Sequence, residues 1–181
     1  MSVPENHYHA VQFYKDGASL ARTVARFFEE GLNAGQPAVM IATPSHARAI
    51  LRALSASGCN VPSLRRTGQL QTLDAEKVLA SFMPGATLDP VLFKSNVGDL
   101  IERLYDGEKP SSIRAYGEMV DLLWQRGNAD GAIRLEILWN QLASHYSFSL
   151  MCGYAVGQFY KETRDPRYAE VCAQHSHVLP A

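Results

Sequence analysis

The sequence predicts an α/β protein with a mostly parallel sheet flanked by helices on both faces. Short apolar segments typical of strands alternate along the chain with amphipathic segments long enough to act as crossover helices. One apolar segment, residues 37–42, has no polar face, as expected of a strand that is covered on both sides. Because 181 residues that are 46% hydrophobic can close one core, we expect a single domain over residues 1–181, with its core over about 7–178.

The first half of the chain predicts strands joined by helices. The strands are residues 9–14, 37–42 and 69–73. After the first strand, a helix is expected to begin at Ser19, with Gly31 as a stop signal. After the second strand, Thr43 can cap a helix, Pro44 can take its first position, and Gly58 ends it. The segment between this helix and the third strand is interpreted as a loop.

The second half continues the alternation. Two further strands are residues 112–116 and 148–154. Asp74 is placed to cap a short helix, and a longer amphipathic helix is expected over residues 90–105. Gly117 allows a sharp turn into a helix that ends at Gly127, and a helix with an apolar stripe follows at once. A last helical segment should reach about Cys172, and the remainder is interpreted as a tail.

The composition argues against several classes of protein. With 17 basic and 18 acidic residues and no basic run, direct binding to nucleic acid is not expected. No segment is apolar for long enough to span a membrane, and residues 1–9 are polar rather than typical of a secretion signal, which predicts a cytoplasmic protein. The odd number and wide spacing of the cysteines favour reduced, buried thiols at Cys59, Cys152 and Cys172.

Several phrases in a fixed order resemble the MEDS family of sensory domains. They are HAVQFYKD at 9–16, ATPSH at 42–46, RAYGEMVDLLW at 114–124, LEILWNQL at 135–142, SLMCGY at 149–154 and CAQHS at 172–176. The resemblance implies a RecA/KaiC-like fold without the phosphate-binding loop, in a stand-alone sensory module for a small, organic molecule. It also implies a signalling partner, such as a histidine kinase or regulator in two-component regulation.

Chemistry typical of a RecA-like ATPase is missing from the sequence. The turn after the most apolar strand, TPSHARA at 43–49, has neither the glycines nor the lysine of a Walker A loop, and Pro44 removes an N–H donor. The chain contains no Gly-Lys dipeptide. Ordinary ATP hydrolysis is therefore not expected, although the helix that begins after this turn leaves nucleotide binding as an alternative.

Polar side chains gather where the predicted strands end, and the ligand crevice of an open α/β sheet lies beyond those carboxyl ends. The candidate ligand-binding residues are Tyr14, Lys15, Asp16, Thr43, His46, Tyr116, Glu118 and Tyr154. The secondary candidates are Glu136 and Asn140, which are one helical turn apart, and Trp139, which lies between them. For Thr43 the alternative role is a helix cap, and for Tyr14 and Tyr154 it is packing.

Glu118 and His46 raise the question of catalysis. Together they have the groups of a general acid and base, but a carboxylate at the start of a helix is also favoured by the helix dipole, and this structural role is preferred. The prediction is a binding protein with no catalytic residues. A degenerate NTPase or hydrolase and a protein-interaction scaffold remain the alternatives.

No metal or cofactor is predicted. The histidines near the two ends of the chain lack partners at zinc-like spacing, although Cys172 is close to His175; they are His7, His9, His175 and His177. Haem remains open, because axial ligation needs only one residue and an apolar pocket. A homo-oligomer is a further possibility, with Trp124 and Trp139 either at its surface or, as preferred, in the core.

Overall fold

Six strands form one sheet in the computed structural model, which describes residues 8–105, 112–155, 157 and 166–181. The strands are β1 (His9–Tyr14), β2 (Ala38–Ala42), β3 (Leu70–Asp74), β4 (Ile113–Gly117), β5 (Phe148–Ala155) and β6 (His177–Leu179). Their order across the sheet is β3-β2-β4-β5-β1-β6, and every neighbouring pair is parallel. The predicted α/β class is confirmed, and the sheet is parallel throughout its described part.

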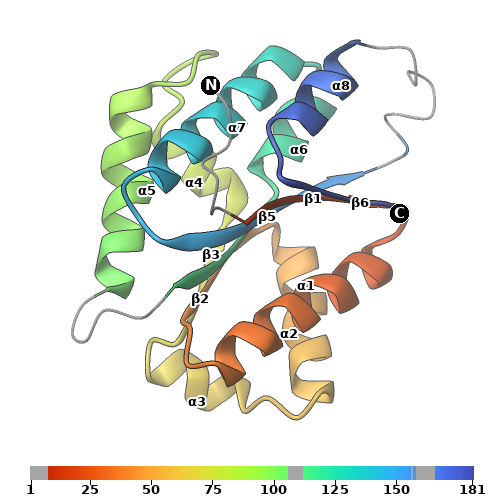
Figure 1. Ribbon diagram of the computed structural model, residues 1–181, viewed down its shortest axis with the longest axis vertical. Helices are drawn as coiled ribbons and strands as arrows, with labels where there is room; N and C mark the ends of the chain where they lie inside the picture. The colour runs from red at the N-terminus through yellow and green to blue at the C-terminus, as the bar shows by residue number, and fades with distance from the viewer. Residues whose placement is uncertain (1–7, 106–111, 156, 158–165) are drawn as a thin grey trace.

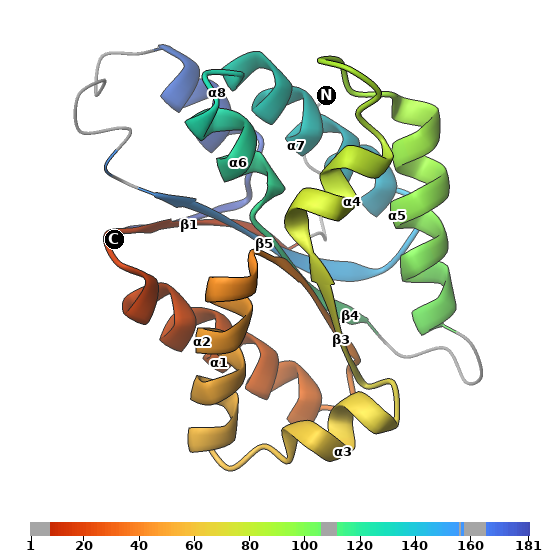
Figure 2. The ribbon, with the colours of Figure 1, turned by 180° about the vertical axis from the view of Figure 1, so that it is seen from behind.

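Helices cover both faces of the sheet (Figures 1 and 2). On one face lie α1 (Gly17–Asn33), α2 (Pro44–Ala56) and α3 (Val61–Arg66). On the other face lie α4 (Ala75–Ser81), α5 (Pro90–Leu104), α6 (Met119–Gln125), α7 (Ala129–Ala143) and α8 (Pro166–Ala173). This arrangement is consistent with a RecA-like layout.

The alternation of side chains along β2 explains why this strand is continuously apolar. Met40 packs in the core beside α1 and α2, whereas Val39 and Ile41 pack in the core beside α4 to α7. All five residues of β2 are buried. Since successive side chains point to opposite faces and both faces of β2 are covered, this strand has an apolar residue at every position.

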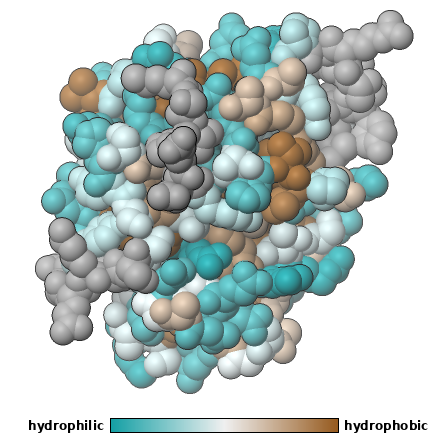
Figure 3. Space-filling model, in the orientation of Figure 1, coloured by the Kyte–Doolittle hydropathy of each residue, from teal (hydrophilic) through white to brown (hydrophobic). Residues whose placement is uncertain are grey.

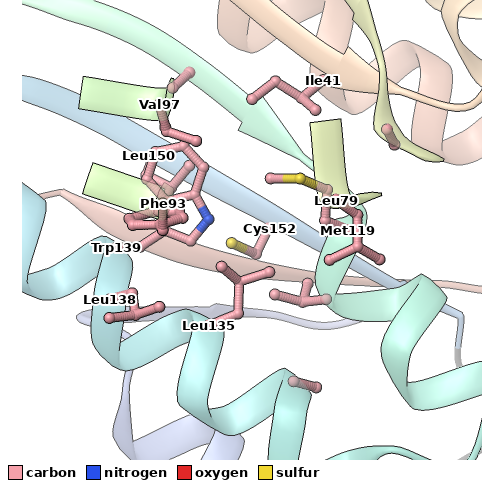
Figure 4. Close-up of a cluster of buried hydrophobic side chains, with 14 of the residues drawn as sticks. Ile41, Leu79, Phe93, Val97, Met119, Leu135, Leu138, Trp139, Leu150 and Cys152 are labelled. Carbon is pink, nitrogen blue, oxygen red and sulfur yellow. The ribbon is translucent and has the colours of Figure 1, made fainter. Parts of the chain in front are cut away.

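The larger core lies between the sheet and the second helical layer. Figure 4 shows Leu135 and Trp139 of α7 beside Cys152 of β5. The Trp139 ring meets the ring of Phe93 edge-on, with centroids 5.4 Å apart, and Trp139 is 1% exposed. Trp124 is also buried, so both tryptophans are core residues, as preferred from the sequence.

The starts of two helices differ in detail from the prediction. α1 begins before Ser19, because the side chain of Asp16 accepts hydrogen bonds from the backbone N–H groups of Ala18 and Ser19 and so caps the helix earlier. Thr43 stands at the cap position of α2, but its side chain makes no cap bond; its hydroxyl oxygen lies 3.3 Å from that of Ser45.

Two short elements were not predicted. α3 lies in the segment interpreted as a loop, and it starts where the Asn60 side chain accepts a bond from the Ser63 N–H. β6 lies in the segment interpreted as a tail, and it pairs with β1 at Ala10, Val11 and Gln12. Of the helix expected to reach about Cys172, α8 is described, whereas residues 156 and 158–165 lie outside the described residues.

The visible surface is mixed. On the face in Figure 3, hydrophobic residues form small areas separated by hydrophilic ones. In the part of the chain that the structure describes, no helix combines the length and apolar character needed to cross a membrane. These observations agree with the absence of an apolar span from the sequence.

Candidate functional site

The carboxyl ends of the parallel strands form one edge of the sheet, where neighbouring strands lead to opposite layers. β2 leads to α2 on one face, while its neighbour β4 leads to α6 on the other (Figure 1). In the same way β1 leads to α1, whereas the next described helix after its neighbour β5 is α8 on the opposite face. Ligand crevices of open α/β sheets lie at such points, because the diverging connections leave space between them.

Glu118 occupies the point between β2 and β4. It follows β4 directly, is 2% exposed, and receives donors on both carboxylate oxygens. The backbone N–H of Thr43 donates to Oε1, and the hydroxyl of Tyr116 donates to Oε2 at 3.0 Å. His46 Nδ1 lies 2.8 Å from Oε2. One buried carboxylate therefore joins the end of β2, the start of α2 and the end of β4.

Charge is favoured on both members of the His46–Glu118 pair. The hydrogen bond to Glu118 raises the pKa of His46 above its ordinary value, against the effect of burial. Burial alone would raise the pKa of Glu118, but the bonds from His46 and Thr43 outweigh it and hold that pKa below its ordinary value. The His46 side chain is 24% exposed, so it is the member of this pair that solvent or a ligand can reach.

A second buried carboxylate, Asp121, lies at the neighbouring point between β1 and β5. It accepts hydrogen bonds from the Tyr14 hydroxyl at 3.0 Å, the Gln125 amide at 2.6 Å and the Ala155 backbone N–H at 3.1 Å. Burial raises its pKa in spite of these donors. Asp121 was missed in the sequence, although it stands three residues after Glu118 in the first turn of α6.

Tyr14 and His46 connect the two carboxylates. Their rings meet edge to face, with centroids 5.6 Å apart and planes at 89°. The turn after β1 also approaches His46, since a Cβ atom on Gly17 would lie 3.4 Å from the imidazole ring. We call Tyr14, Thr43, His46, Tyr116, Glu118 and Asp121 the edge network.

Other predicted site residues do not join the edge network. Lys15 and Asp16 follow β1 but are exposed, and the Asp16 side chain caps α1. Tyr154 is fully buried on the opposite face of the sheet, where its hydroxyl donates to Glu136 Oε1 at 3.0 Å. Its position near the end of β5 did not predict this, because successive residues of a strand face opposite layers. Trp139 packs in the core.

The secondary candidate Glu136 belongs to a separate buried group, which we call the interior cluster, and the Asn140 side-chain oxygen contacts this group at His9 Nδ1, 2.9 Å away. Its members His9, Glu136, Cys152 and His175 offer side-chain atoms that lie within 4.8 Å of one another. They come from β1, α7, β5 and the segment after α8. Glu136 lies 3.2 Å from His9 Nε2 and 3.3 Å from His175 Nε2, and the Cys152 thiol donates to it at 3.3 Å.

Burial and charge oppose each other within the interior cluster. Burial would raise the pKa of Glu136, but His175 and His9 hold that pKa well below its ordinary value. Burial lowers the pKa of His9 and raises that of the Cys152 thiol well above the ordinary value. For His175, attraction by Glu136 outweighs burial and raises the pKa.

Comparison with known families places this geometry in context. Residues 8–175 match the family described as MEDS, the methanogen/methylotroph, DcmR sensory domain. The chain belongs to the MEDS family. A sensory role in signalling follows at the level of the family. No curated protein matches the chain.

In this MEDS domain, the start of α2 is already engaged by an acidic group. The Thr43 N–H that a phosphate would need donates to Glu118, and Pro44 has no N–H to offer. Glu118 therefore supplies the negative charge that the amino end of this helix favours.

Proposed function

We propose that this MEDS domain binds a small, organic molecule beside His46 and passes the bound state to a signalling protein. The observation that carries the proposal is the position of Glu118, which is buried between the two layers and joined to a partly exposed histidine. A ligand that hydrogen-bonds His46 would compete with Glu118 for it. Since Glu118 also holds the start of α2 and begins α6, a change in that bond would reach both layers.

The same contacts favour binding over catalysis. Both oxygens of Glu118 already accept hydrogen bonds from the protein, and those of Asp121 do so as well. A general base needs an oxygen available to the substrate's proton. We therefore favour a binding protein without enzymatic activity, and turnover of a nucleotide that disappears in Glu118→Gln would contradict this.

For the partner, we propose a histidine kinase or a response regulator, in keeping with the sensory family and with two-component regulation. Cytoplasmic action is part of the same proposal. The three cysteines are free thiols, which suits a reducing compartment.

A second candidate function is a protein-interaction scaffold with a closed site. It is favoured by the hydrogen bonds of the edge network, because donors of the protein itself already occupy both carboxylates. In that case partner binding would not depend on any small molecule.

Native mass spectrometry of protein purified gently from its own host separates these functions. A discrete extra mass that denaturation releases supports the binding function, and its value distinguishes an organic molecule from a nucleotide or haem. The same spectrum reports any homo-oligomer.

Thermal unfolding then locates the binding site. The ligand should raise the melting temperature of the wild type and of His145→Ala, an exposed control, but not that of His46→Ala. Three results together would favour the scaffold over the sensor. They are that no mass is released, that no organic candidate stabilises the chain, and that partner binding does not depend on a ligand.

A further inference from the structure

The interior cluster combines two imidazoles, a thiol and a carboxylate in a region without solvent. His9, Glu136 and Cys152 are at most 1% exposed, and His175 is 8% exposed with a side chain that is 0% exposed. This set lies on the other side of the sheet from Tyr14 and His46, and the proposed sensory ligand does not involve it. Buried polar groups of this kind require partners, because an unsatisfied one costs about 1–3 kcal/mol.

Hydrogen bonds outside the cluster fix the orientation of both imidazole rings. The Asn140 amide nitrogen donates to the Gln174 carbonyl at 2.9 Å, so its oxygen accepts from His9 Nδ1, also at 2.9 Å. His175 Nδ1 donates to the Val171 carbonyl at 2.7 Å. Since Nδ1 of each ring is engaged outside the cluster, Nε2 is the ring nitrogen that lies within it, close to Glu136. Histidines that bind metals are held in this way by their second nitrogen.

One inward-facing nitrogen, His175 Nε2, has no hydrogen-bonding partner in the described part of the chain. His175 Nε2 is buried and lies 3.3 Å from Glu136 Oε1, yet it makes no hydrogen bond of acceptable geometry. The two atoms are close but are not aligned for a hydrogen bond. The nitrogen is thus aimed into the cluster without a hydrogen-bonding partner.

The separations between the ligand atoms suit a tetrahedral metal ion. With bonds of about 2.0–2.3 Å to nitrogen, oxygen and sulfur, neighbouring ligand atoms around zinc lie about 3.3–3.6 Å apart. Here His9 Nε2 and Cys152 Sγ lie 3.2 and 3.3 Å from Oε2 of Glu136, His175 Nε2 lies 3.3 Å from Oε1, and one atom of each residue lies within 4.8 Å of every other. His9 Nε2 lies 3.5 Å from Cys152 Sγ.

We propose that His9, Glu136, Cys152 and His175 form a closed site for a divalent first-row transition metal, with Zn²⁺ as the best fit. Two imidazoles, a thiolate and a carboxylate are ligands that zinc prefers, and a thiolate disfavours Mg²⁺ and Ca²⁺. On binding, the Cys152 thiol loses its proton to solvent as the sulfur–metal bond forms. The two anionic ligands then balance the charge of the ion, so the site adds no net charge to the core.

The site was not found in the sequence because its ligands are far apart there. In the sequence, His9 and His175 stand out together with Cys172, His7 and His177. In the structure Cys172 is not a member of the cluster, His177 is exposed and packs against Tyr8, and His7 lies outside the described residues. The missing ligands come from β5 and α7, which only the fold brings to His9.

Cobalt substitution of the full chain tests the proposal. After dialysis against a chelator, the wild type should bind a single Co²⁺ or Zn²⁺ ion, and the cobalt form should show a thiolate-to-metal charge-transfer band. Cys152→Ser should lose this band, whereas the control Cys59→Ser should keep it. His175→Gln should weaken Zn²⁺ binding by at least about 100-fold, and His145→Gln should not. Absence of stoichiometric metal uptake by the wild type, or a band that persists in Cys152→Ser, would overturn the site.

X-ray absorption of the zinc-loaded wild type keeps the test independent of variant folding. Circular dichroism first establishes whether Cys152→Ser is folded. If it is not, the wild-type spectrum decides: sulfur in the first shell together with nitrogen and oxygen supports the site, and a shell of nitrogen and oxygen alone contradicts it. Neither result bears on the ligand at His46, so the two proposals stand or fall separately.

Discussion

Glu118 illustrates how one side chain can hold two layers of a protein together. Its carboxylate is removed from water, which is costly, but it receives a backbone N–H, a hydroxyl and an imidazole. The donors come from the residue after β2, from the first turn of α2 and from β4. Loss of the carboxylate would therefore leave the half-buried Thr43 N–H and the buried Tyr116 hydroxyl without this acceptor.

We expect Glu118→Ala to lower the free energy of unfolding by about 2–4 kcal/mol, because stranded buried donors add to the lost hydrogen bonds. Urea denaturation at neutral pH measures this. Glu170→Ala, on the exposed side of α8, is the matched control and should leave stability unchanged. A Glu118→Ala chain as stable as the control would mean that water replaces the carboxylate.

The His46–Glu118 pair should make stability depend on pH. Since the pKa of His46 is raised, its contribution is complete below its ordinary value of 6.5 and is lost as pH rises through the raised value. Since the pKa of Glu118 is lowered, its contribution is complete above 4.5 and is lost as pH falls through the lowered value. The pair therefore stabilises the protein most between pH 4.5 and pH 6.5.

Thermal unfolding of the wild type and His46→Gln checks this window. The variant should be less stable by roughly 0.5–1 kcal/mol inside it, and the difference should shrink as pH rises above it. Asp121 also acts on His46 through its charge, burial raises the pKa of Asp121, and the raised pKa of Tyr14 keeps that phenol neutral. A difference that stays constant into the alkaline range would indicate that His46 contributes by packing alone.

The candidate site was predictable for residues at or just after the end of a strand, because their position in the sequence puts them at the carboxyl edge of the sheet. The rule for strand ends anticipated Tyr14, Thr43, His46, Tyr116 and Glu118, which do meet at one edge. It could not assign faces, so Tyr154 was grouped with them although its hydroxyl lies in the opposite layer. It also could not find contacts between distant segments, and for that reason the interior cluster needed the structure.

At the scale of elements, burial on both faces made β2 predictable from its continuous apolar run. The long helices were equally clear, because an amphipathic period repeats over several turns. α3 and β6 span six and three residues, too short to display a period. Their existence depends on a cap at Asn60 and on pairing with β1, which are local and tertiary interactions rather than patterns.

β4 and β5 depend on a close fit between Gly153 and Tyr116. A Cβ atom at Gly153 would lie 2.6 Å from the Tyr116 hydroxyl oxygen and 3.3 Å from its ring. Tyr116 is fully buried, so it cannot move aside easily. We expect Gly153→Ala to destabilise the chain by about 1–3 kcal/mol and to disturb the bond from Tyr116 to Glu118.

A double-mutant cycle with Tyr116→Phe measures this fit. Removal of the hydroxyl takes away the closest atom, so Gly153→Ala should cost less in the Phe background. Gly98→Ala is the control, because its Cβ would make ordinary contact, 3.6 Å from Leu142, within a helix that favours alanine. Equal costs in the two backgrounds would show that the hydroxyl is not what Gly153 accommodates.

At the scale of the whole molecule, the interior cluster joins the two ends of the described chain. β6 adds a short strand to the edge of β1, and Ser176 exchanges hydrogen bonds with His9 through backbone and hydroxyl groups. Figure 1 shows β1 and β6 side by side. A metal held by His9 and His175 would link the same two segments to Cys152 of β5 and Glu136 of α7. The short pairing of β6 with β1 would then open less easily.

Hydrogen exchange with and without Zn²⁺ should reveal this link. At a free zinc concentration about 100 times the dissociation constant, binding stabilises the closed state by about 2.7 kcal/mol, which slows exchange through local opening by up to about 100-fold. The effect should appear together in β1 and residues 171–179, while α2 and α3, in the other layer, serve as the internal reference. Protection confined to the neighbourhood of the exposed His145 would instead mean surface binding. Protection that is equal everywhere would mean that these segments open only when the whole chain unfolds.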